Sequence, residues 1–325
     1  MSAPFTHAFD WARRKVDSGA LPTAVLGVVT ASGIEAVDAF GTTGTRPARV
    51  EDHYRLFSIT KPLVGLAAAR MIEAGLATPE TPLQDDVPTF GGDRDDVVRL
   101  RHLASHTSGI AEPPMDTAEG LEAGLLGPRD FAAGSASRYS TIAFEGIARM
   151  IHARTARTWD AAVADVVSPV GATGLTLDEA SNPHDIADAA DDGLNLQQFV
   201  ALRHPGAGLI GRAEDLLQIA AALLRDAGEI VRPATLAMMR RPLTGDIPRL
   251  DPYTAERGQD WGFTWNLRTR APGLIDRDVY GHGGWSGAEF WVHPTAGVAF
   301  VLLTNLSIRP GVNLDELDNA VVSGV

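Results

Sequence analysis

The chain has 325 residues, a formal net charge of −13 and no cysteine. The negative charge makes nucleic acid and anionic membrane surfaces poor partners, and the lack of cysteine excludes disulfides, thiolate nucleophiles and cysteine-based zinc sites. No run of apolar residues approaches the roughly 18 that span a membrane, and no basic and apolar leader opens the chain, so we expect a cytoplasmic protein.

The hydrophobic pattern changes twice along the chain, from strands to helices and back to strands. Residues 5–17 predict an amphipathic helix, and residues 21–29 and 34–40 predict the two strands of a hairpin. Helical spacing then dominates, and strand signals return after about residue 260. The expected helices are 60–75, 97–105, 141–154, 158–167, 212–225 and one near 314–323, and the expected later strands are 261–267, 279–281, 288–293 and 297–304.

This order predicts an α+β fold: an α/β sandwich with an all-α insertion. Residues 1–60 and 203–325 would form one antiparallel sheet with flanking helices, and residues 61–202 would form a mainly helical inserted domain. We expect the active-site cleft between these two parts.

The tetrapeptide Ser58-Ile59-Thr60-Lys61 lies at the predicted start of a helix. One helical turn places the Ser58 hydroxyl and the Lys61 amine on the same face, where the amine can activate the hydroxyl as a nucleophile. The alternative interpretation is a helix-capping serine followed by a surface lysine.

Lysine is scarce in this chain. Of 28 basic residues, only Lys15 and Lys61 are lysines. Arginine supplies surface charge but does not release its proton in a protein. Lys61 is therefore a candidate for a role that needs a deprotonatable amine.

Three later segments carry further candidate chemistry. Tyr139, in Ser137-Arg138-Tyr139-Ser140-Thr141, is a candidate general base or proton shuttle, because a cationic Lys61 beside it would lower the pKa of its phenol; the alternative is a packing aromatic. His106 is interpreted as a turn histidine whose ring bonds local backbone rather than as a base. Glycines at 281, 283, 284 and 287 allow close backbone approach to a ligand, or else mark a strand bend.

The pattern argues against two other interpretations of these segments, Ser286 as the nucleophile and a metal site at His102 and His106. Ser286 lies in a near match to the Gly-x-Ser-x-Gly elbow, but position 288 is alanine and the strand–turn–helix setting is missing. His102 and His106 are four residues apart, but the glutamate of the zinc-protease pattern His-Glu-x-x-His is missing. We expect neither a metal nor a cofactor.

Taken together and in this order, the segments resemble the serine β-lactamase and penicillin-binding protein superfamily. The resemblance is closest to the class C β-lactamase-like branch, which includes the family VIII carboxylesterases. It covers nearly the whole chain and rests on the N-terminal hairpin, Ser58-x-x-Lys61, residues 102–109, Tyr139-Ser140, residues 208–216, Trp261-Gly262-Phe263 and Gly281-His282-Gly283-Gly284.

The resemblance implies the β-lactamase/DD-peptidase-like fold and acyl transfer through an acyl-serine. Ser58 would be the nucleophile, and Lys61 and Tyr139 would share the proton transfers. The backbone N–H groups of Ser58 and Trp285 would form the oxyanion hole. The motif His282-Gly283-Gly284 would contribute to substrate binding.

Two departures from the family pattern favour an esterase. Position 141 is threonine where β-lactamases of this type carry the asparagine of Tyr-x-Asn, and position 282 is histidine where the third motif often begins with lysine. The lost amide contact and the lost permanent cation both weaken selection for β-lactam or peptide substrates.

We therefore expect a carboxylesterase that acts on small esters. A β-lactamase-like amide hydrolase or D-amino-acid peptidase and a biosynthetic acyltransferase stay open, because pocket shape sets the leaving group and the acceptor. A catalytically dead binding scaffold is the non-enzyme alternative. The oligomeric state is open.

Overall fold

The computed structural model describes residues 4–254, 256, 258–270, 273 and 275–325. Its main sheet has eight strands in the order β3-β2-β1-β10-β9-β8-β7-β6, and all neighbours pair antiparallel. The sheet strands are β1 (Thr23–Thr30), β2 (Gly33–Thr43), β3 (Arg46–Pro47), β6 (Asp260–Trp261), β7 (Asn266–Leu267), β8 (Tyr280–Gly283), β9 (Glu289–His293) and β10 (Val298–Leu303). A separate pair joins β4 (Tyr54–Arg55) to β5 (Ile210–Gly211).

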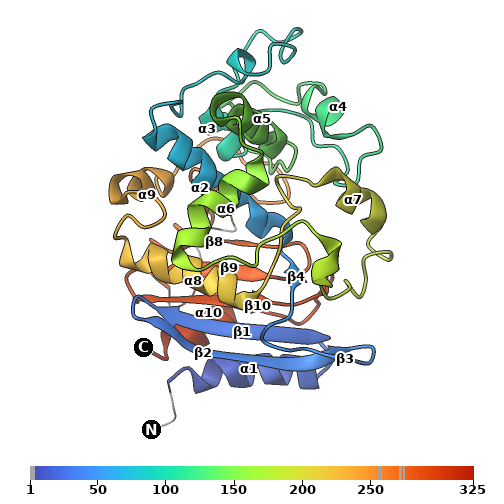
Figure 1. The fold of residues 1–325 in the computed structure, drawn as a ribbon, viewed down its shortest axis with the longest axis vertical. Helices are drawn as coiled ribbons and strands as arrows, with labels where there is room; N and C mark the ends of the chain where they lie inside the picture. The colour runs from blue at the N-terminus through green and yellow to red at the C-terminus, as the bar shows by residue number, and fades with distance from the viewer. Residues whose placement is uncertain (1–3, 255, 257, 271–272, 274) are drawn as a thin grey trace.

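Helices cover both faces of the sheet and extend away from one of them (Figure 1). The α-helices are α1 (Thr6–Asp17), α2 (Thr60–Glu73), α3 (Leu100–Ala104), α4 (Leu121–Leu125), α5 (Ala143–Thr155), α6 (Trp159–Val167), α7 (Leu196–Leu202), α8 (Ala213–Arg225), α9 (Pro233–Met239) and α10 (Leu314–Val322). α1 and α10 pack on one face of the sheet, and α8 packs on the other, with α2, α5 and α6 beyond it.

Burial on both faces explains the apolar runs of the central strands. In β10, Ala299, Val301 and Leu303 belong to the core beneath α8, and the alternate residues Val298 and Phe300 belong to the core beneath α1 and α10. A strand covered on both faces reads as a continuous apolar run rather than an alternating one. The predicted α+β fold, with one antiparallel sheet built from both ends of the chain, is confirmed.

The predicted strand over 261–267 is wrong, because the chain turns back on itself there. β6 and β7 pair with each other, and the N–H of Gly262 donates to the carbonyl of Trp265 at 2.9 Å. Thr264, at the turn, has a φ of 66° and packs on α2 at Gly65, where a Cβ would lie 1.7 Å from its hydroxyl oxygen. The missing side chain of Gly65 therefore permits the close approach of this turn to α2.

The predicted helix over 97–105 is also too long. It begins only at Leu100, because the preceding residues are extended: Arg99 forms an isolated antiparallel bridge with Pro82, and the N–H of Leu83 donates to the carbonyl of Val98. The predicted helix over 141–154 begins two residues later than expected, at Ala143.

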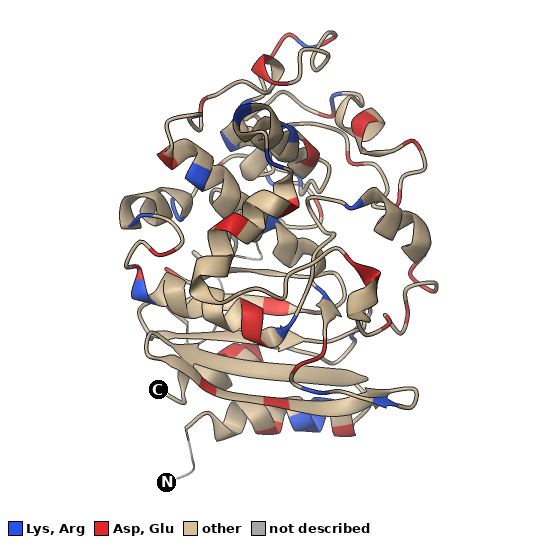
Figure 2. Ribbon diagram, viewed as in Figure 1, with Lys and Arg blue, Asp and Glu red and all other residues tan. Residues whose placement is uncertain are grey.

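Acidic and basic residues are interspersed over the ribbon (Figure 2). Within the described part of the chain, no helix is both long and apolar enough to cross a membrane.

Candidate active site

Ser58 lies in a short 3-10 helix, η1 (Phe57–Ile59), which leads directly into α2. Its neighbour Phe57 has a φ of 43°, a backbone conformation that is strained for a bulky residue. The Phe57 ring is held by Phe199, with ring centroids 5.2 Å apart, and by Trp285 at 5.1 Å. Aromatic packing thus maintains the strained turn that places Ser58, which is only 8% exposed, at the start of α2.

Lys61 is one helical turn after Ser58 and is fully buried. Its Nζ donates to Ser58 Oγ at 3.0 Å, to the Gly206 carbonyl at 2.9 Å and to Thr141 Oγ1 at 3.3 Å. Burial lowers the pKa of Lys61 to about 7, against the opposing charge of the Glu112 carboxylate. A large share of this lysine is therefore uncharged near neutral pH and able to accept the proton of Ser58.

Tyr139 lies beside both residues. Lys61 Nζ is 4.7 Å from the centre of the Tyr139 ring, and the phenol shares a hydrogen bond with the Ser58 side chain. The predicted fall in its pKa is wrong: burial, and then Tyr253, raise the pKa of Tyr139 well above its ordinary value. The cation expected to lower this pKa is itself suppressed by burial, so Tyr139 keeps its proton and is a hydrogen-bond donor.

His106 supports Tyr139 and is not placed as a base for Ser58. Its Nδ1 accepts the backbone N–H of Ser140 at 3.0 Å, and its ring lies 4.5 Å from Tyr139 and 4.3 Å from Trp261. Burial, and then the Lys61 charge, hold the pKa of His106 well below its usual range. The ring does bond backbone, as expected, but that backbone is 34 residues away rather than in its own turn.

Glu112 is a neighbour of Lys61 that the sequence did not reveal. Its carboxylate accepts the N–H of Thr141 at 2.9 Å and that of Ile142 at 3.3 Å, just before α5 begins. Burial around the carboxylate raises the pKa of Glu112, although other parts of the residue are exposed. Glu112 stands in a Pro-containing connection with no motif, so no local signal could have found it.

The glycine-rich segment after Tyr280 forms the opposite wall of the site. Gly284 lies against the residues before Ser58, because a Cβ there would be 2.5 Å from the Leu56 carbonyl oxygen. Gly287 has a φ of 88°, and the Arg309 side chain fills the place where its Cβ would be. These close approaches require glycine at both positions.

Arg309 fastens this segment to the chain after β10. Its Nη1 donates to the carbonyls of Trp285 at 3.3 Å, Leu306 at 2.7 Å and Ser307 at 3.1 Å. Ser286 is buried, and its hydroxyl donates to the Arg55 carbonyl at 3.2 Å, which is a structural contact. The position of Trp285, whose N–H is the predicted oxyanion donor, thus depends on Arg309.

His282 points away from the open part of the site. It is 1% exposed, its Nδ1 donates to the Gly283 carbonyl at 2.7 Å, and its ring packs beside those of Tyr139 and Trp261, with centroids 6.0 and 5.6 Å away. Burial and the Lys61 charge lower the pKa of His282 to about 3. The imidazole is therefore neutral and does not line the cavity, unlike Gly283, Gly284 and Trp285.

Ser58, Tyr139 and Trp285 open onto one cavity of about 460 Å³, which we call the Ser58 cavity. Its walls come from segments far apart in the chain: Ser58, Met115, Tyr139, Thr141, Pro252, Tyr253, Gln259, Asn266, Arg268, Gly283, Gly284, Trp285, Glu289, Trp291, Arg309 and Leu314. Within the described residues, no cluster of three or more histidine, aspartate and glutamate side chains is arranged to hold a metal ion.

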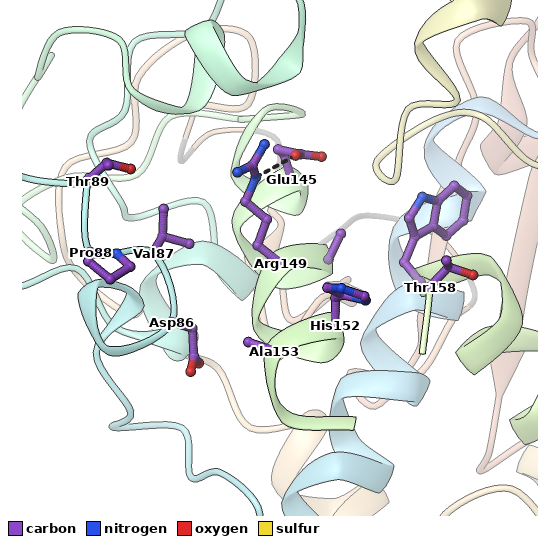
Figure 3. A pocket seen from close by; sticks show the side chains of 11 residues that line it. Asp86, Val87, Pro88, Thr89, Glu145, Arg149, His152, Ala153 and Thr158 are labelled. Atoms are coloured by element: carbon purple, nitrogen blue, oxygen red, sulfur yellow. Dashed lines mark hydrogen bonds and ion pairs between the residues drawn. The ribbon is translucent and has the colours of Figure 1, made fainter. Parts of the chain in front are cut away.

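A second cavity of about 460 Å³ lies among the helices, and we call it the Arg149 cavity (Figure 3). It is lined by the segment 86–89, by Arg149 and His152 of α5, and by Thr158; His152 lies on the side of α5 toward Thr158, and Arg149 Nε donates to Glu145 at 2.7 Å. None of Ser58, Lys61 and Tyr139 lines it, and it offers no nucleophile beside a buried base.

Comparisons with known proteins agree with this geometry. A family model described as Beta-lactamase matches residues 9–322. Esterase EstB of Burkholderia gladioli is 26% identical to this chain, over 80% of this chain and 79% of that protein. The similarity of this chain to EstB and its match to the family model together confirm the resemblance to the serine β-lactamase superfamily that the motifs indicate.

Two solved structures show the fold. A penicillin-binding protein homologue from Caulobacter crescentus aligns with a TM-score of 0.82 at 19% identity, over 100% of this chain and 99% of that chain. EstCE1, described as a hydrolase with promiscuous acyltransferase activity, aligns with a TM-score of 0.78 at 20% identity, over 97% of both chains.

Proposed function

Because this chain belongs to the beta-lactamase family, whose matched relatives include serine hydrolases, we propose that it is a carboxylesterase that cleaves small esters through an acyl-Ser58 intermediate. The observation that carries the proposal is the contact of Ser58 Oγ with the Lys61 amine at 3.0 Å, at the wall of the Ser58 cavity. Burial lowers the pKa of this amine to about 7, which suits a general base at neutral pH.

In acylation, the Ser58 oxygen attacks the ester carbonyl carbon while its proton passes to Lys61 Nζ. The negative charge on the carbonyl oxygen would be stabilised by the backbone N–H groups of Ser58 and Trp285. The carbon–oxygen bond to the alcohol then breaks, and the leaving alkoxide takes a proton from the phenol of Tyr139, which recovers it from Lys61. Water repeats the sequence on the acyl-enzyme and releases the acid and Ser58.

The two departures from the β-lactamase pattern support the choice of ester over β-lactam. Thr141 places its hydroxyl 3.3 Å from Lys61 Nζ, so it is engaged with the lysine and has no amide to offer a substrate. His282 is buried and uncharged, so it supplies no permanent cation for a substrate carboxylate. EstB supports the same choice by its name.

Acyl transfer is the second candidate, because EstCE1, a structural neighbour, is described as having promiscuous acyltransferase activity. Hydrolysis and transfer share the acyl-Ser58 intermediate and differ only in the acceptor. Adding a primary alcohol to the assay separates them, since a transferase forms the new ester in preference to the acid.

The test compares a short-chain p-nitrophenyl ester with a chromogenic cephalosporin. We expect efficient cleavage of the ester and slow or no cleavage of the cephalosporin. Much faster cleavage of the cephalosporin would contradict the esterase assignment. A fluorophosphonate should label Ser58, and its failure to label folded protein would favour a dead binding scaffold.

A further inference from the structure

The Ser58 cavity continues past the nucleophile to a polar end on the face of the sheet that carries α10. This end is lined by Asn266 of β7, Glu289 and Trp291 of β9, and the side chains of Arg268 and Arg309. None of these residues takes part in the ester cleavage proposed above, except that Arg309 positions the segment around Trp285 through its hydrogen bond to the Trp285 carbonyl. We call this group the polar end of the cavity.

Two glycines in β8 make room for the side chains of β9. Gly281 pairs with Trp291 and Gly283 with Glu289 across the two strands. A Cβ on Gly283 would lie 3.0 Å from Glu289 Oε2, and one on Gly281 would lie 2.6 Å from the Trp291 ring. The Glu289 carboxyl therefore lies against Gly283, which itself lines the same cavity as Ser58.

Glu289 is a buried acid that forms no ion pair with any residue the structure describes. It is 4% exposed, and its Oε2 accepts the Trp291 Nε1 hydrogen at 2.6 Å. The nearby guanidinium groups are engaged elsewhere, because Arg268 forms an ion pair with Asp318 of α10 and Arg309 donates to backbone carbonyls. Burial raises the pKa of Glu289 to about 7.

Asn266 is the second unusual group. It is 3% exposed, yet its Oδ1 has no hydrogen-bond partner among the residues the structure describes. Gln259, also in the cavity wall, likewise has a buried Oε1 without a partner. A buried polar group without a partner is costly, and such groups in a cavity wall point to a ligand that completes their hydrogen bonds.

The chemistry of this end excludes three kinds of ligand group. An alkyl chain would leave the polar atoms of Asn266 and Glu289 unpaired and dry. An anion would lie against the Glu289 carboxyl and the bare carbonyl oxygen of Asn266, and a cation would lie near the guanidinium groups of Arg268 and Arg309, so neither sign of charge suits all the groups of this end. A neutral hydroxyl group, which donates one hydrogen bond and accepts others, fits all of them.

We propose that the polar end of the cavity binds a hydroxyl group carried by the ester substrate, with Asn266 and Glu289 as its hydrogen-bond partners. The preferred substrates are then hydroxylated esters rather than simple alkyl esters. This inference rests on the proposed esterase function and adds the substrate class.

The test uses two pairs of esters that differ only by exchange of a methyl group for a hydroxyl. Ethyl butyrate and ethyl 3-hydroxypropanoate differ in the acyl part, and propyl acetate and 2-hydroxyethyl acetate differ in the alcohol part. Acid release at constant pH gives kcat/KM for each ester. Within one enzyme sample, the ratio of the two kcat/KM values of a pair does not depend on the fraction of the protein that is folded.

We expect the wild-type ratio to favour the hydroxylated ester by about tenfold in at least one pair, the factor that one hydrogen bond of ~1.4 kcal/mol supplies. Asn266→Leu should bring the kcat/KM ratio of that pair close to the ratio of the rates at which the two esters hydrolyse without enzyme. Glu289→Gln can still form a hydrogen bond to a hydroxyl, so it should retain more of the preference for the hydroxylated ester. His152→Leu, in the Arg149 cavity, should leave the ratio unchanged.

Equal ratios in wild type and Asn266→Leu, with both alkyl esters cleaved, would overturn this inference and leave the esterase assignment intact. Failure of the fluorophosphonate to label Ser58, with none of the four esters cleaved, would instead overturn the proposed function and this inference with it.

Discussion

The Ser58 cavity and the Arg149 cavity have the same volume of about 460 Å³ but opposite chemistry. In the Arg149 cavity the charged groups satisfy one another, since Arg149 pairs with Glu145 and Asp86 pairs with Arg154 at 2.5 Å. His152 is exposed, and its Nδ1 lies 3.3 Å from the Arg157 carbonyl oxygen.

The Ser58 cavity instead keeps its polar groups buried and reactive. Lys61, behind Ser58, is fully buried with a lowered pKa, and Asn266 Oδ1 in the cavity wall has no hydrogen-bond partner in the described part of the chain. A stable fold gains little from such groups, whereas a site that binds and turns over a substrate needs them. The two cavities therefore differ in their buried polar groups and not in their volume. Variants in the Arg149 cavity can serve as matched controls for variants in the Ser58 cavity.

The largest contrast should follow removal of a hydroxyl from each cavity. Ser58→Ala should reduce kcat for p-nitrophenyl butyrate by roughly 10⁴-fold or more, because no other group can form the acyl intermediate. Thr89→Ala, at the exposed Thr89 of the Arg149 cavity, should leave kcat unchanged. Turnover by Ser58→Ala near the wild-type rate would remove Ser58 from the mechanism.

Removal of a cation should separate the cavities almost as strongly. Lys61→Ala should lower kcat by roughly 10³-fold, within the range of a general base. Lys61→Arg should not rescue it, because arginine keeps its charge and cannot accept the Ser58 proton. Arg149→Ala removes two ion pairs, with Glu145 and Glu122, in the wall of the Arg149 cavity and should leave kcat unchanged. Full activity of Lys61→Arg would show that charge alone is needed.

An aromatic pair gives the third contrast. Tyr139→Phe keeps the ring beside His106 but removes the phenol that bonds Ser58, and should lower kcat by roughly 10²-fold. The loss should be greatest for esters of poorly acidic alcohols, since their alkoxides most need the proton. Trp159→Phe in the Arg149 cavity is the control. An equal loss for all leaving groups would contradict proton donation by Tyr139.

Tyr139 also shows where sequence reasoning stopped. The contact between Ser58 and Lys61 was predictable, because it depends only on one helical turn. The direction of the Tyr139 pKa shift was not, because it depends on burial by segments such as the one around Tyr253. The turn at Thr264 was missed for the same reason, since a distant glycine on α2 makes room for it.

Four other residues of the site have no local signature. Glu112, Asn266, Glu289 and Arg309 come from four separate segments, and each is an ordinary polar residue in its own stretch of sequence. Asn266 and Glu289 meet in the Ser58 cavity only because β7, β8 and β9 lie side by side in the sheet, and Arg309 reaches that cavity from the chain after β10. Glu112 instead lies near Lys61, from the connection between α3 and α4. Lysine scarcity was informative because it marked one residue type whose chemistry arginine cannot replace.

A smaller effect should come from loosening the Trp285 segment. Arg309→Gln removes the guanidinium that bonds three carbonyls, including that of Trp285 at 3.3 Å. We expect kcat to fall by about tenfold with a smaller change in KM, because the oxyanion donor is used mainly in the transition state. Free guanidinium in the assay should restore part of the activity. A change in KM alone would place Arg309 in substrate binding instead.

The smallest expected effect is a shift in pH dependence. Activity should rise with pH through a midpoint near 7, because the base form of Lys61, whose pKa burial lowers to about 7, takes the Ser58 proton. His106, His204 and His282 all face Lys61, but burial lowers the pKa of each below its usual range, so they stay uncharged through this interval.

The Glu112 carboxylate raises the pKa of Lys61, so Glu112→Gln should move the midpoint of kcat/KM to lower pH while keeping the oxygen that accepts the Thr141 N–H. Glu145→Gln, which removes a carboxylate from the Arg149 cavity, should leave the midpoint where it is. A midpoint that moves to higher pH in Glu112→Gln would mean that the rise reports a group other than Lys61, since loss of a neighbouring negative charge can only favour the neutral amine.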